Sequence, residues 1–107
     1  MQPYTDKRAS PRTAAKIPVM AIGRDATHKP MTEQSETLLI NEAGALIALA
    51  AELPMQGRIQ LVNRNTGVGC EARVAWRSSA QIAGRWSYGV ALIDPPSDFW
   101  GTGSTQN

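Results

Sequence analysis

The sequence predicts an all-β fold: a small antiparallel barrel of roughly six strands, preceded by a basic arm. Two observations lead to this fold class. Short stretches of alternating apolar and polar residues recur at roughly 8–12-residue spacing, separated by turns rich in Gly, Pro and Asn. The chain has only 107 residues, which suits one domain with one core. Closing such a sheet into a barrel removes most exposed edges, so a barrel is favoured over an open sheet.

Residues 1–13 are expected to form a flexible arm, because they are polar, contain Pro3 and Pro11, and show no apolar periodicity. The barrel domain is predicted over 14–100. Its first strand is marked by the apolar positions Ile17, Val19 and Ala21. Pro18 makes this strand an edge or a strand beginning. A loop is expected over 23–31.

The second strand is predicted over 32–40 and is followed by a turn over 41–44. Asn41 tolerates left-handed backbone angles and Gly44 adopts them freely, which favours a turn. Residues 43–53 have helical propensity. We nevertheless predict a strand over 45–49, because the turn before it and Pro54 after it leave little room for a helix.

The second half of the chain alternates more regularly. A strand over 58–63 should turn Ile59 and Leu61 inward, and a Gly-containing turn over 64–67 should join it to the next strand. That strand, over 68–76, is expected to bury alternate residues, namely Val68, Cys70, Ala72 and Val74. After a loop over 78–85, a last strand covers 86–92, with Trp86 and Tyr88 expected in the core.

Two features follow the last strand. Phe99 and Trp100 are interpreted as a hydrophobic plug on one end of the barrel or sheet. Residues 101–107 are polar, and we expect a disordered tail.

Composition narrows the class of protein. No apolar run is long enough to span a bilayer, and the first fifteen residues lack the apolar core of a signal peptide, so we expect a cytoplasmic protein without membrane insertion. The single Cys70 excludes an internal disulfide and a cysteine-based zinc site, and it is expected to be an inert core residue.

Enzymatic activity is not expected. His28 is the only histidine, and its polar surroundings favour a turn residue over a catalytic one. The sequence contains no Gly-rich phosphate loop and no evident acid–base pair or metal cluster, so we assign no catalytic residue, metal ligand or cofactor.

The net charge of +2 comes from the amino-terminal arm. Residues 1–16 hold Lys7, Arg8, Arg12 and Lys16 against Asp6, whereas basic and acidic residues nearly balance in the rest of the chain. Arg8 and Arg12 are four apart around Ser10 and Pro11, so they can act as two guanidinium forks on an extended segment that clamps phosphate. The other interpretation is a solvated tail. A barrel for single-stranded nucleic acid is disfavoured, because the body is not basic.

These features together resemble the PilZ domain family, the bacterial receptors for cyclic di-GMP, over residues 8 to about 100. Arg8 and Arg12 match the family's Arg-x-x-x-Arg motif in place and spacing. The window Leu39–Gly44 aligns with its Asp/Asn-x-Ser-x-x-Gly motif. The later strands are also similar, through Arg73-Val74-Ala75-Trp76 and Tyr88-Gly89-Val90, as is the ending Phe99-Trp100-Gly101.

The second motif departs from the family pattern. Leu39 stands at the acid position and cannot accept a hydrogen bond, and Asn41 stands where the family has Ser. The resemblance implies a binding site for cyclic di-GMP formed by Arg8, Arg12, Asn41, Gly44 and Trp76. For Trp76, packing in the core or at the rim is the alternative to stacking on a base.

Two functions remain open from the sequence. The resemblance implies a bacterial single-domain PilZ-like protein that binds cyclic di-GMP, weakly if the altered motif matters, and signals to an effector protein. The alternative is a degenerate module of the same type that binds no nucleotide and acts through protein contacts. Arg8 and Arg12 favour the first function, and Leu39 favours the second.

Overall fold

The computed structural model describes residues 13–101, and within this range the backbone forms seven strands and no helix. The strands are β1 (Thr13–Ala14), β2 (Pro18–Arg24), β3 (Pro30–Asn41), β4 (Gly44–Leu49), β5 (Arg58–Asn63), β6 (Val68–Arg77) and β7 (Trp86–Ile93). The predicted all-β class is therefore confirmed, and the helical propensity of residues 43–53 is overridden by strand pairing.

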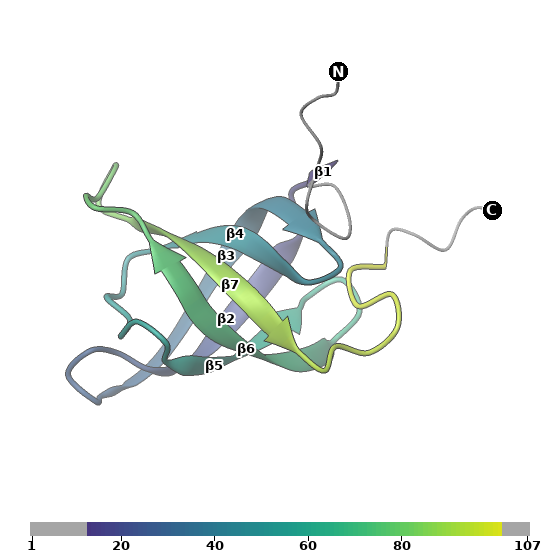
Figure 1. The fold of residues 1–107 in the computed structure, drawn as a ribbon, viewed down its shortest axis with the longest axis horizontal. Coiled ribbons are helices and arrows are strands. Elements are labelled where there is room, and N and C mark those ends of the chain that lie inside the picture. Colours follow the sequence, from purple (N-terminus) through teal and green to yellow (C-terminus); the bar gives the residue numbers. More distant parts are fainter. Residues whose placement is uncertain (1–12, 102–107) are drawn as a thin grey trace, which may run out of the picture.

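Six of the strands close into an antiparallel barrel (Figure 1). The order around the barrel is β3-β2-β5-β6-β7-β4, and an additional pairing of β3 with β4 closes the ring. β1 is a seventh, two-residue strand that pairs with β3, placing Thr13 opposite Ile40 and Ala14 opposite Leu39. The six-stranded barrel expected from the alternation is confirmed, and β1 is an addition that two residues are too few to predict.

The core occupies the barrel interior and follows the period of two along each strand. On β5, Ile59 and Leu61 point inward and are buried. On β6, Cys70, Ala72 and Val74 are buried as predicted, but Val68 is 42% exposed, so its predicted burial is wrong. Val68 opens β6 directly after the hairpin turn, at the barrel rim. Alternation decides which face a residue takes, but not how far the core extends along the strand.

The first hairpin is tighter than the sequence suggests, because β2 continues to Arg24 and β3 begins at Pro30. The Asp25 carboxylate holds the intervening turn by accepting hydrogen bonds from the backbone N–H groups of Thr27 and Lys29, at 2.8 and 3.0 Å. The Thr27 hydroxyl also donates to this carboxylate at 2.7 Å, and this bond, together with the bonds from the two backbone N–H groups, lowers the pKa of Asp25. His28 lies in this turn with a φ of 69°, so its interpretation as a turn residue is confirmed.

Phe99 and Trp100 plug one end of the barrel, as the sequence predicts. Both side chains are buried, and their rings meet edge to face with centroids 4.8 Å apart. The side-chain amide of the buried Asn63 donates to the Phe99 carbonyl at 2.9 Å. The Trp100 indole N–H donates to the Asn41 carbonyl at 2.9 Å. The plug is thereby attached to two of the turns at this end.

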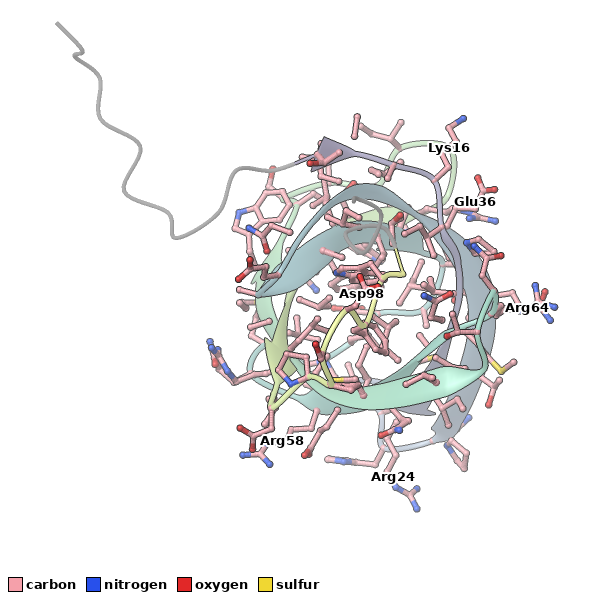
Figure 2. All side chains as sticks on the ribbon, turned by 90° about the vertical axis from the view of Figure 1, so that its right-hand side faces the viewer. Lys16, Arg24, Glu36, Arg58, Arg64 and Asp98 are labelled. Atoms are coloured by element: carbon pink, nitrogen blue, oxygen red, sulfur yellow. The ribbon has the colours of Figure 1, made fainter. Side chains whose placement is uncertain are left out.

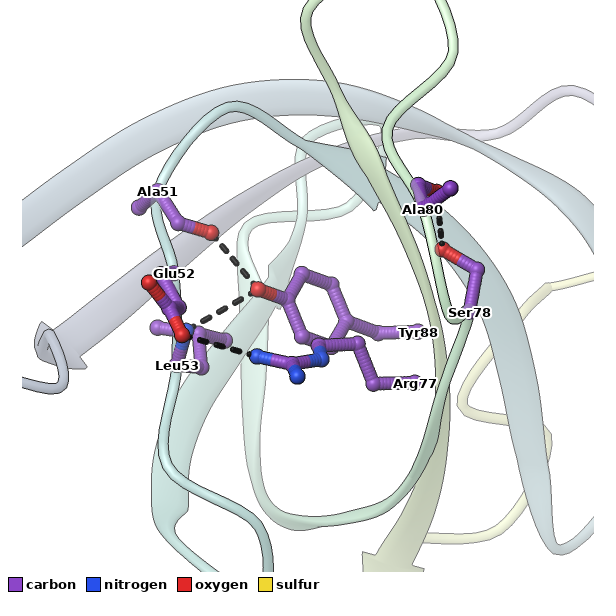
Figure 3. Close-up of polar contacts among 7 residues, drawn as sticks. All are labelled: Ala51, Glu52, Leu53, Arg77, Ser78, Ala80 and Tyr88. Carbon is purple, nitrogen blue, oxygen red and sulfur yellow. Dashed lines mark hydrogen bonds and ion pairs between the residues drawn. The ribbon is translucent and has the colours of Figure 1, made fainter.

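The opposite end is closed by the segment 50–57, which is held by the fully buried Tyr88 (Figure 3). The Tyr88 hydroxyl donates to the Ala51 carbonyl at 2.7 Å and accepts from the Leu53 N–H at 2.9 Å. Arg77 adds an ion pair to Glu52 at 3.0 Å, and its guanidinium lies 4.4 Å from the Trp86 ring centroid. The predicted core position of Tyr88 is confirmed, whereas Trp86 packs half-buried against the core.

Charged side chains surround the barrel, whereas its interior holds apolar residues and the buried polar residues Thr37 and Asn63. Figure 2 shows Lys16, Arg24, Glu36, Arg58 and Arg64 directed outward around the ring. In residues 13–101 there is no helix long and apolar enough to cross a membrane.

Candidate functional site

A groove of about 600 Å³ lies on the outer wall of the barrel. It crosses four neighbouring strands, β3, β4, β7 and β6. One row of directly paired residues runs across it: Leu39 opposite Leu46, Leu46 opposite Gly89, and Gly89 opposite Trp76. Gly44, Ala45 and Ala91 also line the groove, and their small side chains leave space above the sheet.

Trp76 stands at one side of the groove because β6 contains a register shift between Val74 and Trp76. Ala75 and Trp76 are both exposed, so the strict alternation of β6 stops at this bulge. The Trp76 side chain is 51% exposed and lines the groove. A Cβ on Gly89 would lie 3.4 Å from the Trp76 Cβ, so the glycine leaves the space beside this residue open. Trp76 is therefore a groove residue and not a core residue.

The turn over 41–44 forms the far side of the groove and is held by three hydrogen bonds. The Asn41 side-chain oxygen Oδ1 accepts from the Ala43 N–H at 2.8 Å, and the Asn41 carbonyl accepts from Trp100. The Ala43 carbonyl accepts from the Leu92 N–H at 2.8 Å. Asn41 thus has its acceptors engaged, while its side-chain N–H₂ has no hydrogen-bond partner within residues 13–101.

Gly44 is required here for a reason other than the one predicted. Neither Asn41 nor Gly44 has a positive φ, so the expected left-handed geometry of the turn is wrong. A Cβ on Gly44 would instead collide with the carbonyl oxygen of Val90 on β7. Glycine permits close approach of β4 to β7, and any side chain at this position forces the two backbones apart.

Leu39 is half-buried and contributes an apolar wall to the groove. It pairs with Ala14 on one side and with Leu46 on the other, so the first described residues lie directly beside the groove. Thr13, assigned to the arm by the sequence, belongs to β1 and pairs with Ile40.

Three of the five predicted site residues, Asn41, Gly44 and Trp76, line this one groove, although they come from β3, β4 and β6. Arg8 and Arg12 lie outside the described residues. Sequence reasoning missed Leu46 and Gly89 as groove residues, because only the cross-strand register of β4 with β7 brings them together.

Among the described residues, none that lines the groove has an ionisable side chain. Within residues 13–101, no cluster of three His, Cys, Asp or Glu side chains could hold a metal ion. The groove can therefore offer apolar contact, one exposed aromatic ring and the Asn41 amide. In comparisons with known proteins, no family model matches the sequence, and no curated protein does either.

Proposed function

We propose that this protein is a PilZ-like receptor for cyclic di-GMP that acts in the bacterial cytoplasm and presents its ligand-bound surface to an effector protein. The observation that carries the proposal is the meeting of Asn41, Gly44 and Trp76 on one groove. Asn41 and Trp76 are 35 positions apart in the sequence. The resemblance to the PilZ family implies that all three residues contact one ligand.

The basic arm is close enough in sequence to the groove to contribute phosphate ligands. Arg12 directly precedes Thr13, which pairs with Ile40 beside the groove. Because consecutive Cα atoms are about 3.8 Å apart, the chain can bring Arg12 to a phosphate bound there. In this proposal Arg8 and Arg12 bind the phosphates, since a guanidinium offers paired donors to anionic oxygens. Trp76 offers its ring face to a purine.

Calorimetric titration with cyclic di-GMP tests this function. Arg12→Ala should remove a charge-assisted hydrogen bond of about 1.5–3 kcal/mol, which weakens binding about 10- to 150-fold. Arg8→Ala should act similarly. Arg24→Ala is the matched control: it removes the same charge from an exposed side chain that bonds the His28 carbonyl, away from the groove, and should leave the affinity unchanged.

Two outcomes would contradict the proposal. Absence of binding to the folded wild-type protein would remove the function itself. Binding that is unaffected by both Arg8→Ala and Arg12→Ala would place the ligand at another site.

The second candidate function is a PilZ-like module that binds no nucleotide and acts by protein contact. Its support is the apolar character of the groove, where Leu39 and Leu46 are half-buried and Trp76 is half exposed. An exposed aromatic ring beside aliphatic side chains is a common centre of protein interfaces. A wild-type protein that gives no heat with cyclic di-GMP would favour this candidate.

A further inference from the structure

We propose that the groove binds cyclic dinucleotides of adenine about as well as those of guanine, so that it selects a cyclic purine dinucleotide and not one base. This inference rests on the function proposed above and concerns the ligand selectivity of the same groove. It follows from which hydrogen-bonding atoms the groove offers.

Guanine and adenine differ in where they carry donors and acceptors. Guanine has an acceptor at O6 and donors at N1 and N2, whereas adenine has a donor at N6 and an acceptor at N1. Both carry an acceptor at N7. A site that selects guanine through its N–H groups therefore needs an acceptor, such as a carboxylate, facing N1 and N2.

Among residues 13–101, the side chains across the groove provide no such acceptor. The paired row of Leu39, Leu46 and Trp76 presents hydrocarbon and an indole, which has only a donor. At the turn, the Asn41 oxygen Oδ1 already accepts from Ala43 N–H, and the Asn41 carbonyl already accepts from Trp100. Each of these two oxygens is thus already used once to hold the groove wall.

What the groove offers to a base is therefore a donor and an aromatic face. The Asn41 side-chain N–H₂, without a partner in residues 13–101, can donate to N7, which both purines share. Stacking on the exposed Trp76 ring is available to any purine, because every base has a π-face. Neither contact separates adenine from guanine.

The test is a set of calorimetric titrations of the full chain with cyclic di-GMP, cyclic di-AMP and the mixed cyclic GMP–AMP in one buffer. We expect the three dissociation constants to agree within a factor of ten. A difference of more than tenfold between the two symmetric ligands, in either direction, would overturn the inference, while binding of cyclic di-GMP would leave the proposed function standing. No binding of any of the three would overturn the proposed function, and the inference with it.

A designed acceptor sharpens the test. Leu39→Asp places a carboxylate on the groove wall, and we expect it to raise the preference for cyclic di-GMP over cyclic di-AMP by at least tenfold. Leu38→Asp is the matched control, because it adds the same charge on the same strand. Leu38 is 43% exposed and faces a separate hollow beside Arg64 and Arg85, so the preference should not change.

Circular dichroism of each variant checks that the barrel is intact before affinities are compared. If Leu39→Asp does not fold, Leu39→Asn supplies a neutral acceptor at the same position and the same comparison applies. A folded variant that carries an acceptor at position 39 and leaves the preference unchanged would contradict the inference, because the base would then not face this wall.

Discussion

The two ends of the barrel are closed in similar ways, but only one closure is connected to the groove. At one end, the Tyr88 hydroxyl holds the segment 50–57 through Ala51 and Leu53. At the other end, Trp100 closes the barrel and bonds the carbonyl of Asn41, a groove residue. In both cases a buried aromatic ring fills the barrel mouth and its polar atom bonds the backbone.

The two closing residues differ in whether they also hold the groove wall. Tyr88 reaches residues that do not line the groove, so its bonds stabilise the barrel without acting on the groove wall. Trp100 contributes to the core and also fixes the turn that carries Asn41. We therefore expect substitutions at the two ends to separate in a measurement of binding, even where their effects on stability are similar.

The largest effect is expected for Trp100→Ala. Removing this buried ring should lower the free energy of unfolding by about 3–5 kcal/mol, as is typical of a large aromatic deleted from a core. Chemical denaturation monitored by circular dichroism measures this loss. Binding in the groove should weaken as well, because the Asn41 turn loses its attachment. A loss below about 1 kcal/mol would mean that the plug is not part of the core.

Trp100→Phe separates the two contributions of this residue. It keeps an aromatic ring in the barrel mouth and removes the indole donor, so the loss of stability should be limited largely to one hydrogen bond, about 0.5–1.5 kcal/mol, plus any packing defect. A groove affinity that stays at the wild-type value in this variant would show that the Asn41 bond does not support the site.

After Trp100→Ala, the next largest effect is expected for Tyr88→Phe. The ring remains, but the Ala51 carbonyl and the Leu53 N–H lose their partner, which should cost about 1–3 kcal/mol of stability. Thermal unfolding measures the change. Because no contact of the hydroxyl reaches the groove, ligand affinity of the folded protein should be unchanged, and an altered affinity would contradict the proposed separation of the two ends.

The smallest effect is a pH dependence that distinguishes the ends, since within residues 13–101 only one of them carries a titratable hydroxyl. Burial raises the pKa of Tyr88 above its usual value, because the phenolate is poorly solvated there. The contribution of Tyr88 is then complete below about pH 10, where the unfolded tyrosine titrates, and is lost as the pH rises through the higher folded pKa. Unfolding free energies measured from pH 8 upward should decline less steeply in Tyr88→Phe. Burial also raises the pKa of Cys70, so part of the decline should persist in this variant.

The strands could be predicted because their alternation is local, whereas the groove depends on pairing between distant strands. Ile59 and Leu61, or Cys70 and Val74, reveal their buried face within a few residues of sequence. The position of Trp76 does not follow from alternation, because a bulge in β6 turns it outward. A bulge depends on the strand opposite, so the sequence of β6 alone gives no signal for it.

The turn at Gly44 shows a second limit. Sequence reasoning correctly identified a glycine that the fold requires, but it assigned the requirement to backbone angles. The actual cause is the approach of Val90 on β7, which comes 46 residues later in the chain. Within the candidate site, Asn41, Gly44 and Trp76 could be predicted, because the resemblance implies that they contact the same ligand. The binding role of Arg8 and Arg12, which precede the described residues, remains a prediction.

The position of the single cysteine gives this barrel an intrinsic reporter of its own opening. Cys70 is the only thiol in the sequence, and it is 4% exposed on the inner face of β6. A thiol reagent can reach it only when strands separate, so the labelling rate of the unmodified protein measures how often the barrel opens. Ligands that bridge β3, β4, β7 and β6 and bind only the closed barrel should slow this labelling by the factor 1 + L/Kd, where L is the free ligand concentration. The labelling rate of this one buried thiol thus measures how much of the outer groove is occupied by ligand, without any introduced probe.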